Sequence, residues 1–125
     1  MTTADKRAAG PEMKRMMKSA QEAGDFLKSL ANENRLLLLC LLAEGEKSVT
    51  ELETILDLRQ STVSQQLARL RADQLVEARR NGKAVYYSLA SEEARQVIGL
   101  LYDLFCRSGR GKSKDRPGFL KAVAR

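Results

Sequence analysis

Two cysteines, Cys40 and Cys106, have the widest range of chemistry in this sequence of 125 residues, which contains no histidine. Thiols can be oxidised, can bind soft metal ions or can fill an apolar core. Two cysteines without histidine supply too few ligands for a four-coordinate zinc site within one chain. They form no Cys-X-X-Cys pair, and no histidine is present to act as a base. We therefore predict no metal site, no cofactor and no enzyme activity, and we expect reduced thiols in a cytoplasmic protein.

A second group of residues, between positions 61 and 70, has the pattern of a helix that contacts DNA. Val63, Leu67 and Leu70 recur at helical spacing and predict one buried face. The opposite face carries hydroxyls, amides and a guanidinium, which can bind phosphates and base edges; amides can pair bidentately with adenine. Such groups are also common on a solvated surface. The candidate DNA-binding residues of this helix are Ser61, Thr62, Ser64, Gln65, Gln66 and Arg69.

A basic hairpin is predicted directly after this helix. Residues 75–80 and 83–89 alternate apolar and polar side chains, and Asn81-Gly82 between them suits a tight turn. Charges near the tip could lie along the DNA backbone or enter the minor groove, although edge-strand charges also prevent aggregation. A polar helix followed by a basic hairpin favours DNA binding. The candidate residues of this wing are Arg79, Arg80, Asn81 and Lys83.

Periodicity and capping residues place four helices before the hairpin and one after it. This order predicts an α+β, mostly helical winged helix-turn-helix fold. We expect a flexible arm at 1–11, a DNA-binding and dimerisation domain at 12–106 and a basic tail at 107–125. The expected helices are 12 to about 30, a second capped by Asn32 and ended by Gly45, a third opened by a Ser48/Glu51 capping box, a fourth from about 61 to 72, and a last one capped by Ser91 that ends near Cys106.

The distribution of charge supports a nucleic-acid partner. The chain carries a net charge of +6, and residues 59–83 hold six basic and two acidic residues. This concentration favours a polyanion such as double-stranded DNA. The longest apolar run, residues 36–43, is far too short to cross a bilayer, and no signal peptide precedes the domain, so no membrane partner is expected.

Three stretches resemble the ArsR family of bacterial winged-helix repressors. They are residues 30–36 (LANENRL), residues 60–70 (QSTVSQQLARL) and residues 75–87, which include the wing. The resemblance covers roughly residues 20–106. It implies a homodimer built from the first and last helices, which binds a palindromic operator and is released by an inducer. Many members carry a histidine where this chain has Gln66.

The positions of the cysteines are informative about the inducer. Metal-sensing members use cysteines on the third helix or histidines and carboxylates on the last helix, and neither set is present here. One cysteine on the second helix and one late on the last helix resemble the dithiol, sulfide- and persulfide-responsive branch of the family (SqrR- and BigR-like). The resemblance implies repression that is relieved when Cys40 and Cys106 become bridged, with persulfides as inducer. The alternative is a repressor that does not respond to redox conditions, or one that responds to a soft metal ion bound by the two cysteines with Asp103 as a further ligand.

The two thiols are expected to differ in accessibility. Cys40 lies in the apolar second helix, whereas Cys106 lies near the end of the last one. We therefore expect Cys106 to be the more accessible thiol and Cys40 the more buried, protonated one. A disulfide requires Cα atoms within about 7 Å of each other, and inserted sulfur atoms extend that reach. A longer gap would favour a polysulfide bridge over a disulfide.

Overall fold

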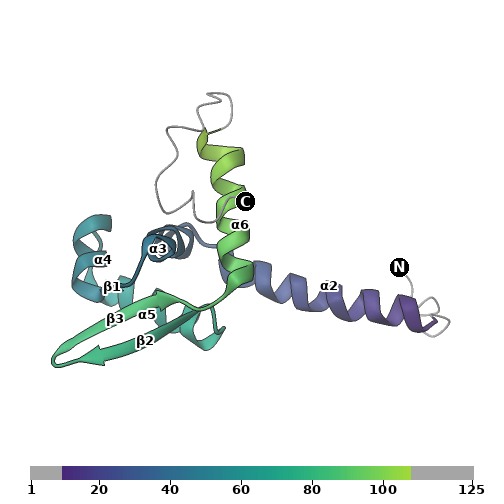
Figure 1. Ribbon diagram of the computed structural model, residues 1–125, viewed down its shortest axis with the longest axis horizontal. Coiled ribbons are helices and arrows are strands. Elements are labelled where there is room, and N and C mark those ends of the chain that lie inside the picture. The colour runs from purple at the N-terminus through teal and green to yellow at the C-terminus, as the bar shows by residue number, and fades with distance from the viewer. Residues whose placement is uncertain (1–9, 108–125) are drawn as a thin grey trace. The chain divides into compact units, whose positions relative to one another are not determined.

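The computed structural model describes residues 10–107, in two units that divide after Ala31 (Figure 1). The first unit contains helix α2, Pro11–Leu30, within which proline occupies the first turn. Proline suits this position because its missing N–H would have no helical partner there. The predicted first helix is thus confirmed. The expected arm at 1–11 and tail at 107–125 lie almost entirely outside the described residues.

The second unit begins with two helices whose start signals are local in sequence. Helix α3, Glu33–Glu44, is capped by the Asn32 side chain, which accepts a hydrogen bond from the backbone N–H of Arg35 at 3.1 Å. Helix α4, Val49–Leu56, opens with the predicted capping box. In that box Ser48 Oγ accepts from the Glu51 N–H at 3.1 Å, while Glu51 Oε1 accepts from the Ser48 N–H at 2.7 Å. Both predicted caps are therefore confirmed.

Helix α5, Gln60–Ala72, is the predicted DNA-contacting helix. Its stripe of Val63, Leu67 and Leu70 is fully buried, at 0% exposed surface for each residue. The stripe packs in a core with α3, which contributes Leu38, Leu39 and Leu42, and with Leu52 of α4. The opposite face of α5 is thereby left outward.

Strands β2, Val76–Asn81, and β3, Ala84–Leu89, form the predicted antiparallel hairpin. The turn differs by one residue from the prediction, because Asn81 pairs with Ala84 and the loop is Gly82-Lys83. Gly82 takes a positive φ of 66°, as a two-residue turn with glycine at its first position requires. A further strand, β1, Lys47–Ser48, was not predicted; it pairs with β3 and gives the sheet order β1-β3-β2.

The chain continues from β3 into helix α6, Glu92–Tyr102, which is capped by Ser91 as predicted. Its last turn widens into a π-helical segment, Asp103–Arg107, which carries Cys106. Ala94, Ile98 and Gly99 form the buried side of α6. Among residues 10–107, no helix is both long and apolar enough to cross a membrane.

Candidate nucleic-acid interface and thiol pocket

The outward face of α5 presents most of the predicted DNA-binding side chains to solvent. Ser61, Ser64, Gln65 and Arg69 are exposed, whereas Thr62 and Gln66 are partly buried at the edge of the face. Arg69 forms an ion pair with Asp73 one turn later, with Nε to Oδ2 at 2.8 Å. This pair is solvent-exposed, so it holds Arg69 only weakly against a phosphate.

Gln66 is held from the side of α3. Its Oε1 accepts a hydrogen bond from Arg35 Nη1 at 2.9 Å, in a partly buried position. The amide of Gln66 was expected to be free to pair with a base, so this contact was not predicted. Arg35 and Gln66 are 31 positions apart, so no local pattern indicates their meeting.

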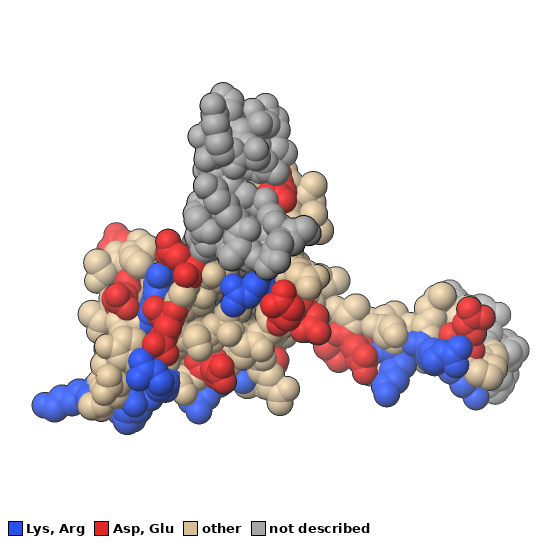
Figure 2. Space-filling view, viewed as in Figure 1, with Lys and Arg blue, Asp and Glu red and all other residues tan. Residues whose placement is uncertain are grey.

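The wing residues divide into two groups. Arg80, Asn81 and Lys83 are exposed around the turn, and Figure 2 shows Lys and Arg side chains gathered at that end of the hairpin. Arg79 instead makes a two-point contact with Glu46, the residue before β1, with Nε to Oε2 at 2.9 Å and Nη2 to Oε1 at 2.8 Å. Its guanidinium also lies over the ring of Tyr86, 4.9 Å from the centroid.

The Glu46–Arg79 pair ties the root of the wing to β1. The hydrogen bond from Arg79 holds the pKa of the Glu46 carboxyl below its usual value, and the same bond raises the pKa of Arg79. Tyr86 pairs with Arg79 across the hairpin and with Ser48 across the other edge of β3. Arg79 therefore links the hairpin to the residue before β1, in a pair that is solvent-exposed like that of Arg69 but is made at two points.

A polar recess of about 310 Å³ lies where the start of α4, the first turns of α5 and the wing meet. It brings together hydroxyl, amide and ammonium groups from segments separated in sequence, all suited to a DNA phosphate. Ser64 and Lys83 were predicted to contact DNA, but the other polar residues of the recess were missed. The Ser48 capping box was the available signal, because it marks the helix start that borders the recess. The missed residues are Ser48, Thr50, Gln60, Tyr86 and Tyr87.

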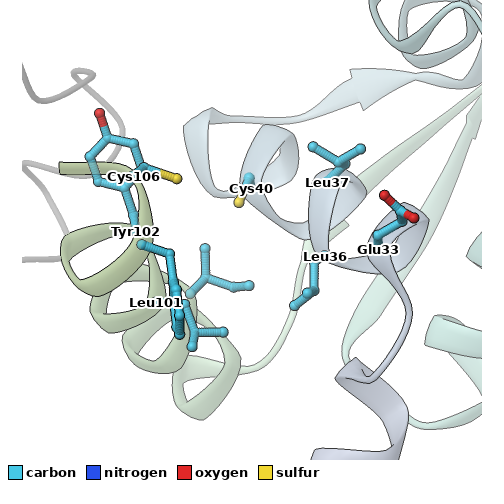
Figure 3. Close-up of a pocket in the computed structure, with 9 residues that line it drawn as sticks. Glu33, Leu36, Leu37, Cys40, Leu101, Tyr102 and Cys106 are labelled. Carbon is cyan, nitrogen blue, oxygen red and sulfur yellow. The ribbon is translucent and has the colours of Figure 1, made fainter. Parts of the chain in front are cut away.

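The two thiols lie in a separate pocket of about 370 Å³ between α3 and the end of α6. Figure 3 shows the sulfur atoms of Cys40 and Cys106 directed toward each other across the gap between the two helices. Apolar side chains form most of the wall, and Glu33 is the charged residue at its edge. The lining residues are Glu33, Leu36, Leu37, Cys40, Ile98, Leu101, Tyr102, Phe105 and Cys106.

The environments of the two thiols differ as expected. Both are free thiols; Cys106 is exposed and Cys40 is partly buried. Burial raises the pKa of Cys40, and the negative charge of a neighbouring Cys106 thiolate raises it further. Cys40 is therefore protonated near neutral pH. No cluster of three or more histidine, cysteine or acidic side chains suited to a metal ion occurs within residues 10–107.

Comparison with known proteins identifies the family. The family model described as "Bacterial regulatory protein, arsR family" matches residues 32–78. The biofilm growth-associated repressor of Agrobacterium fabrum is 50% identical over 91 residues, which cover 73% of this chain and 78% of that protein. The transcriptional activator HlyU of Vibrio cholerae is 41% identical over 104 residues, covering 83% of this chain and 96% of HlyU.

Solved structures agree with this result. The crystal structure of the transcriptional repressor BigR from Xylella fastidiosa matches with a TM-score of 0.68 at 43% identity, covering 78% of this chain and 96% of BigR. The winged helix-turn-helix fold is thus shared with transcription regulators of known structure. The chain belongs to the ArsR family of DNA-binding bacterial transcriptional regulators and is not an enzyme.

Proposed function

We propose that this chain is a homodimeric repressor that leaves its operator when persulfide sulfur bridges Cys40 and Cys106. The observation that carries the proposal is the shared pocket: two thiols 66 positions apart in sequence line one cavity, and their sulfur atoms face each other (Figure 3). Two of the relatives described above are named as repressors and one as an activator, so DNA binding is common to them. A repressor is the simplest regulator in which an inducer acts by release.

The different surroundings of the thiols suit an ordered reaction. Cys106, which is exposed, attacks the sulfane sulfur of a persulfide and releases the corresponding thiol. Cys40 reacts second, because its raised pKa leaves little thiolate to attack a persulfide in solution. Once Cys106 carries sulfur, that sulfur lies in the same pocket as Cys40 and is within reach of the small thiolate fraction. For a bridge with one inserted sulfur, two protein thiols and two persulfides yield the trisulfide, two low-molecular-weight thiols and one hydrogen sulfide. Persulfide is thus the oxidant, and no further reactant is needed.

A bridge would act on DNA binding through the helices that it joins. Cys40 lies on α3, which packs on α5, and Cys106 follows α6. A covalent tie between α3 and α6 constrains the core on which the DNA-contacting helix rests. In a dimer on a palindromic operator, the two copies of α5 must match half-sites about 34 Å apart. A small change in that separation is sufficient to weaken binding.

The proposed dimer contact involves α6. Leu100, Leu104 and Phe105 on α6 and its π-helical end are 55%, 52% and 78% exposed, which is unusual for large apolar side chains in an isolated domain. A second copy would cover them, as the family resemblance implies. Sedimentation or light scattering should therefore give twice the mass of one chain at micromolar concentration.

The dithiol proposal is tested by intact-mass spectrometry combined with DNA-binding anisotropy. The full-length reduced protein is treated with an alkyl persulfide or with peroxide, and free thiols, added mass and operator affinity are measured. We expect persulfide to add one or more sulfur atoms, consume both thiols and release DNA.

Cys40→Ser and Cys106→Ser serve as matched variants for this test. Each should bind the operator when reduced and should no longer be released by persulfide. Release of the double variant by persulfide, or loss of wild-type thiols without release, would reject the dithiol mechanism. If persulfide changes neither the mass nor the operator affinity of the wild-type protein, the cysteines are structural. If only a thiophilic metal ion releases the protein from DNA, the soft-metal alternative is favoured.

A further inference from the structure

The contact between Arg35 and Gln66 determines which hydrogen-bonding groups of Gln66 remain for DNA. Arg35 lies in the first turn of α3, and Gln66 lies in the middle of α5, at the edge between its buried stripe and its outward face. The 2.9 Å hydrogen bond between them is partly buried. It is also charge-assisted, which makes it stronger than a bond between neutral groups.

The chemistry of the two groups fixes the orientation of the amide. A guanidinium has only donors, so the group that faces Arg35 must be the oxygen of Gln66. The amide NH₂ is then directed away from Arg35. Bidentate pairing with adenine requires both ends of the amide, one as donor and one as acceptor. Because the oxygen faces Arg35 and the NH₂ faces away from it, Gln66 is less suited to adenine, which needs both ends of the amide, than to a base that offers only acceptors.

We propose that Arg35 is a positioning residue that makes Gln66 a hydrogen-bond donor to a base-edge acceptor in the major groove. The acceptors of this kind are guanine O6 and N7 and thymine O4. The neighbouring Gln65 is exposed, and it is the amide left for pairing with adenine. Arg35 thus contributes to operator specificity from α3 without contacting a base itself.

This inference rests on the DNA-binding part of the proposed function and is independent of the dithiol. The test uses the reduced full-length protein and selection from a library of randomised DNA duplexes, with the base preference of each variant derived by sequencing. The wild type should show a symmetric pair of positions that favour guanine or thymine over adenine. Gln66→Met should lose that preference and so identify which positions belong to Gln66.

Two variants then test the role of Arg35. Arg35→Met frees the amide to turn, so adenine should become accepted there, and the discrimination against it should fall by about two- to twelvefold, the value of one hydrogen bond. Arg35→Lys keeps a cationic donor and should retain the wild-type preference. Gln66→Glu keeps the partner of Arg35 but removes the donor, and should shift the preference toward cytosine, whose amino group donates.

The outcomes separate this inference from the proposed function. If the wild type selects no sequence at all, the repressor proposal itself fails. If the wild type selects an operator but Arg35→Met gives the same base preferences as the wild type, the positioning role of Arg35 is rejected. If Gln66→Glu also gives them, residue 66 does not contact a base. If Arg35→Met does not fold, Arg35→Gln takes its place, because it also removes the guanidinium and its amide can face either end of the Gln66 amide.

Discussion

Replacing Arg80 by alanine should weaken DNA binding in a salt-dependent way that Arg79→Ala does not reproduce. Both arginines lie on β2 and were predicted as wing contacts, but their states differ. Arg80 is exposed and forms no ion pair with any residue of the described range 10–107. Arg79 is bound at two points to Glu46 and lies over Tyr86. A phosphate can therefore recruit Arg80 directly, whereas it must displace a carboxylate to recruit Arg79.

The size of the effect follows from counterion release. Each phosphate neutralised by a cationic side chain contributes about 0.9 to the slope of log K against log salt. A dimer presents Arg80 twice, so Arg80→Ala should reduce the slope by about 1.8. Between about 50 and 200 mM salt, a fourfold change, the affinity ratio of wild type to variant should shrink by about twelvefold. Arg79→Ala should change the slope by less than half as much.

The assay is fluorescence anisotropy with one operator duplex at four or more salt concentrations, under reducing conditions. Thermal unfolding of each variant shows whether its fold is intact. An Arg80→Ala slope equal to that of the wild type would mean that the wing tip does not reach a phosphate. A slope change for Arg79→Ala as large as that for Arg80→Ala would mean that the pair with Glu46 opens on DNA, and the distinction between the two arginines would be wrong.

Further outcomes are expected for stability, thiol reactivity and titration. Ser48→Ala breaks the capping box of α4 and should lower the free energy of unfolding by about 0.5–2 kcal/mol, measured by urea denaturation at fixed protein concentration. Leu67→Ala opens a cavity beneath α5 and should cost about 2–5 kcal/mol by the same measurement, with a parallel loss of operator binding. In Cys106→Ser, the rate of alkylation of Cys40 should increase with pH, and the midpoint of that increase should lie above the pKa of an ordinary thiol, because burial is the larger cause of the raised pKa of Cys40. A midpoint at the pKa of a free thiol would show that Cys40 is not buried. Because Arg79 lowers the pKa of Glu46, their ion pair should persist as the pH falls below the usual glutamate value of about 4.3 and be lost only further down, as followed by the carboxyl ¹³C shift of Glu46.

The raised pKa of Cys40 also sets the sign of a stability effect. The folded state holds the thiol proton more tightly than the unfolded state, so this contribution is complete below the unfolded thiol pKa of about 8.5. It is lost as the pH rises from there through the folded value. Cys40→Ser should remove this part of the alkaline loss of stability in denaturation experiments above neutral pH. An equal alkaline loss in the variant would show that other groups cause it.

The sequence by itself determined the features that depend on neighbours within a few residues. Caps at Asn32, Ser48 and Ser91 act through backbone groups three positions away, so the starts of three helices were predictable. Helical spacing identified the buried stripe of α5 for the same reason. The outward polar residues of α5 follow from that stripe, because a helix with one face in the core must expose the other.

Only the tertiary structure decided which of those polar groups are already hydrogen-bonded to another part of the protein. The two-residue strand β1 has no periodicity of its own and exists because β3 lies beside it, and the hairpin turn moved by one residue because cross-strand pairing sets the register. The contacts Arg35–Gln66 and Arg79–Glu46 join residues 31 and 33 positions apart, and the thiol pocket joins residues still farther apart. A side chain's type specifies what it can bond, but the packing of α3 against α5 and α6 determines which partner lies within reach.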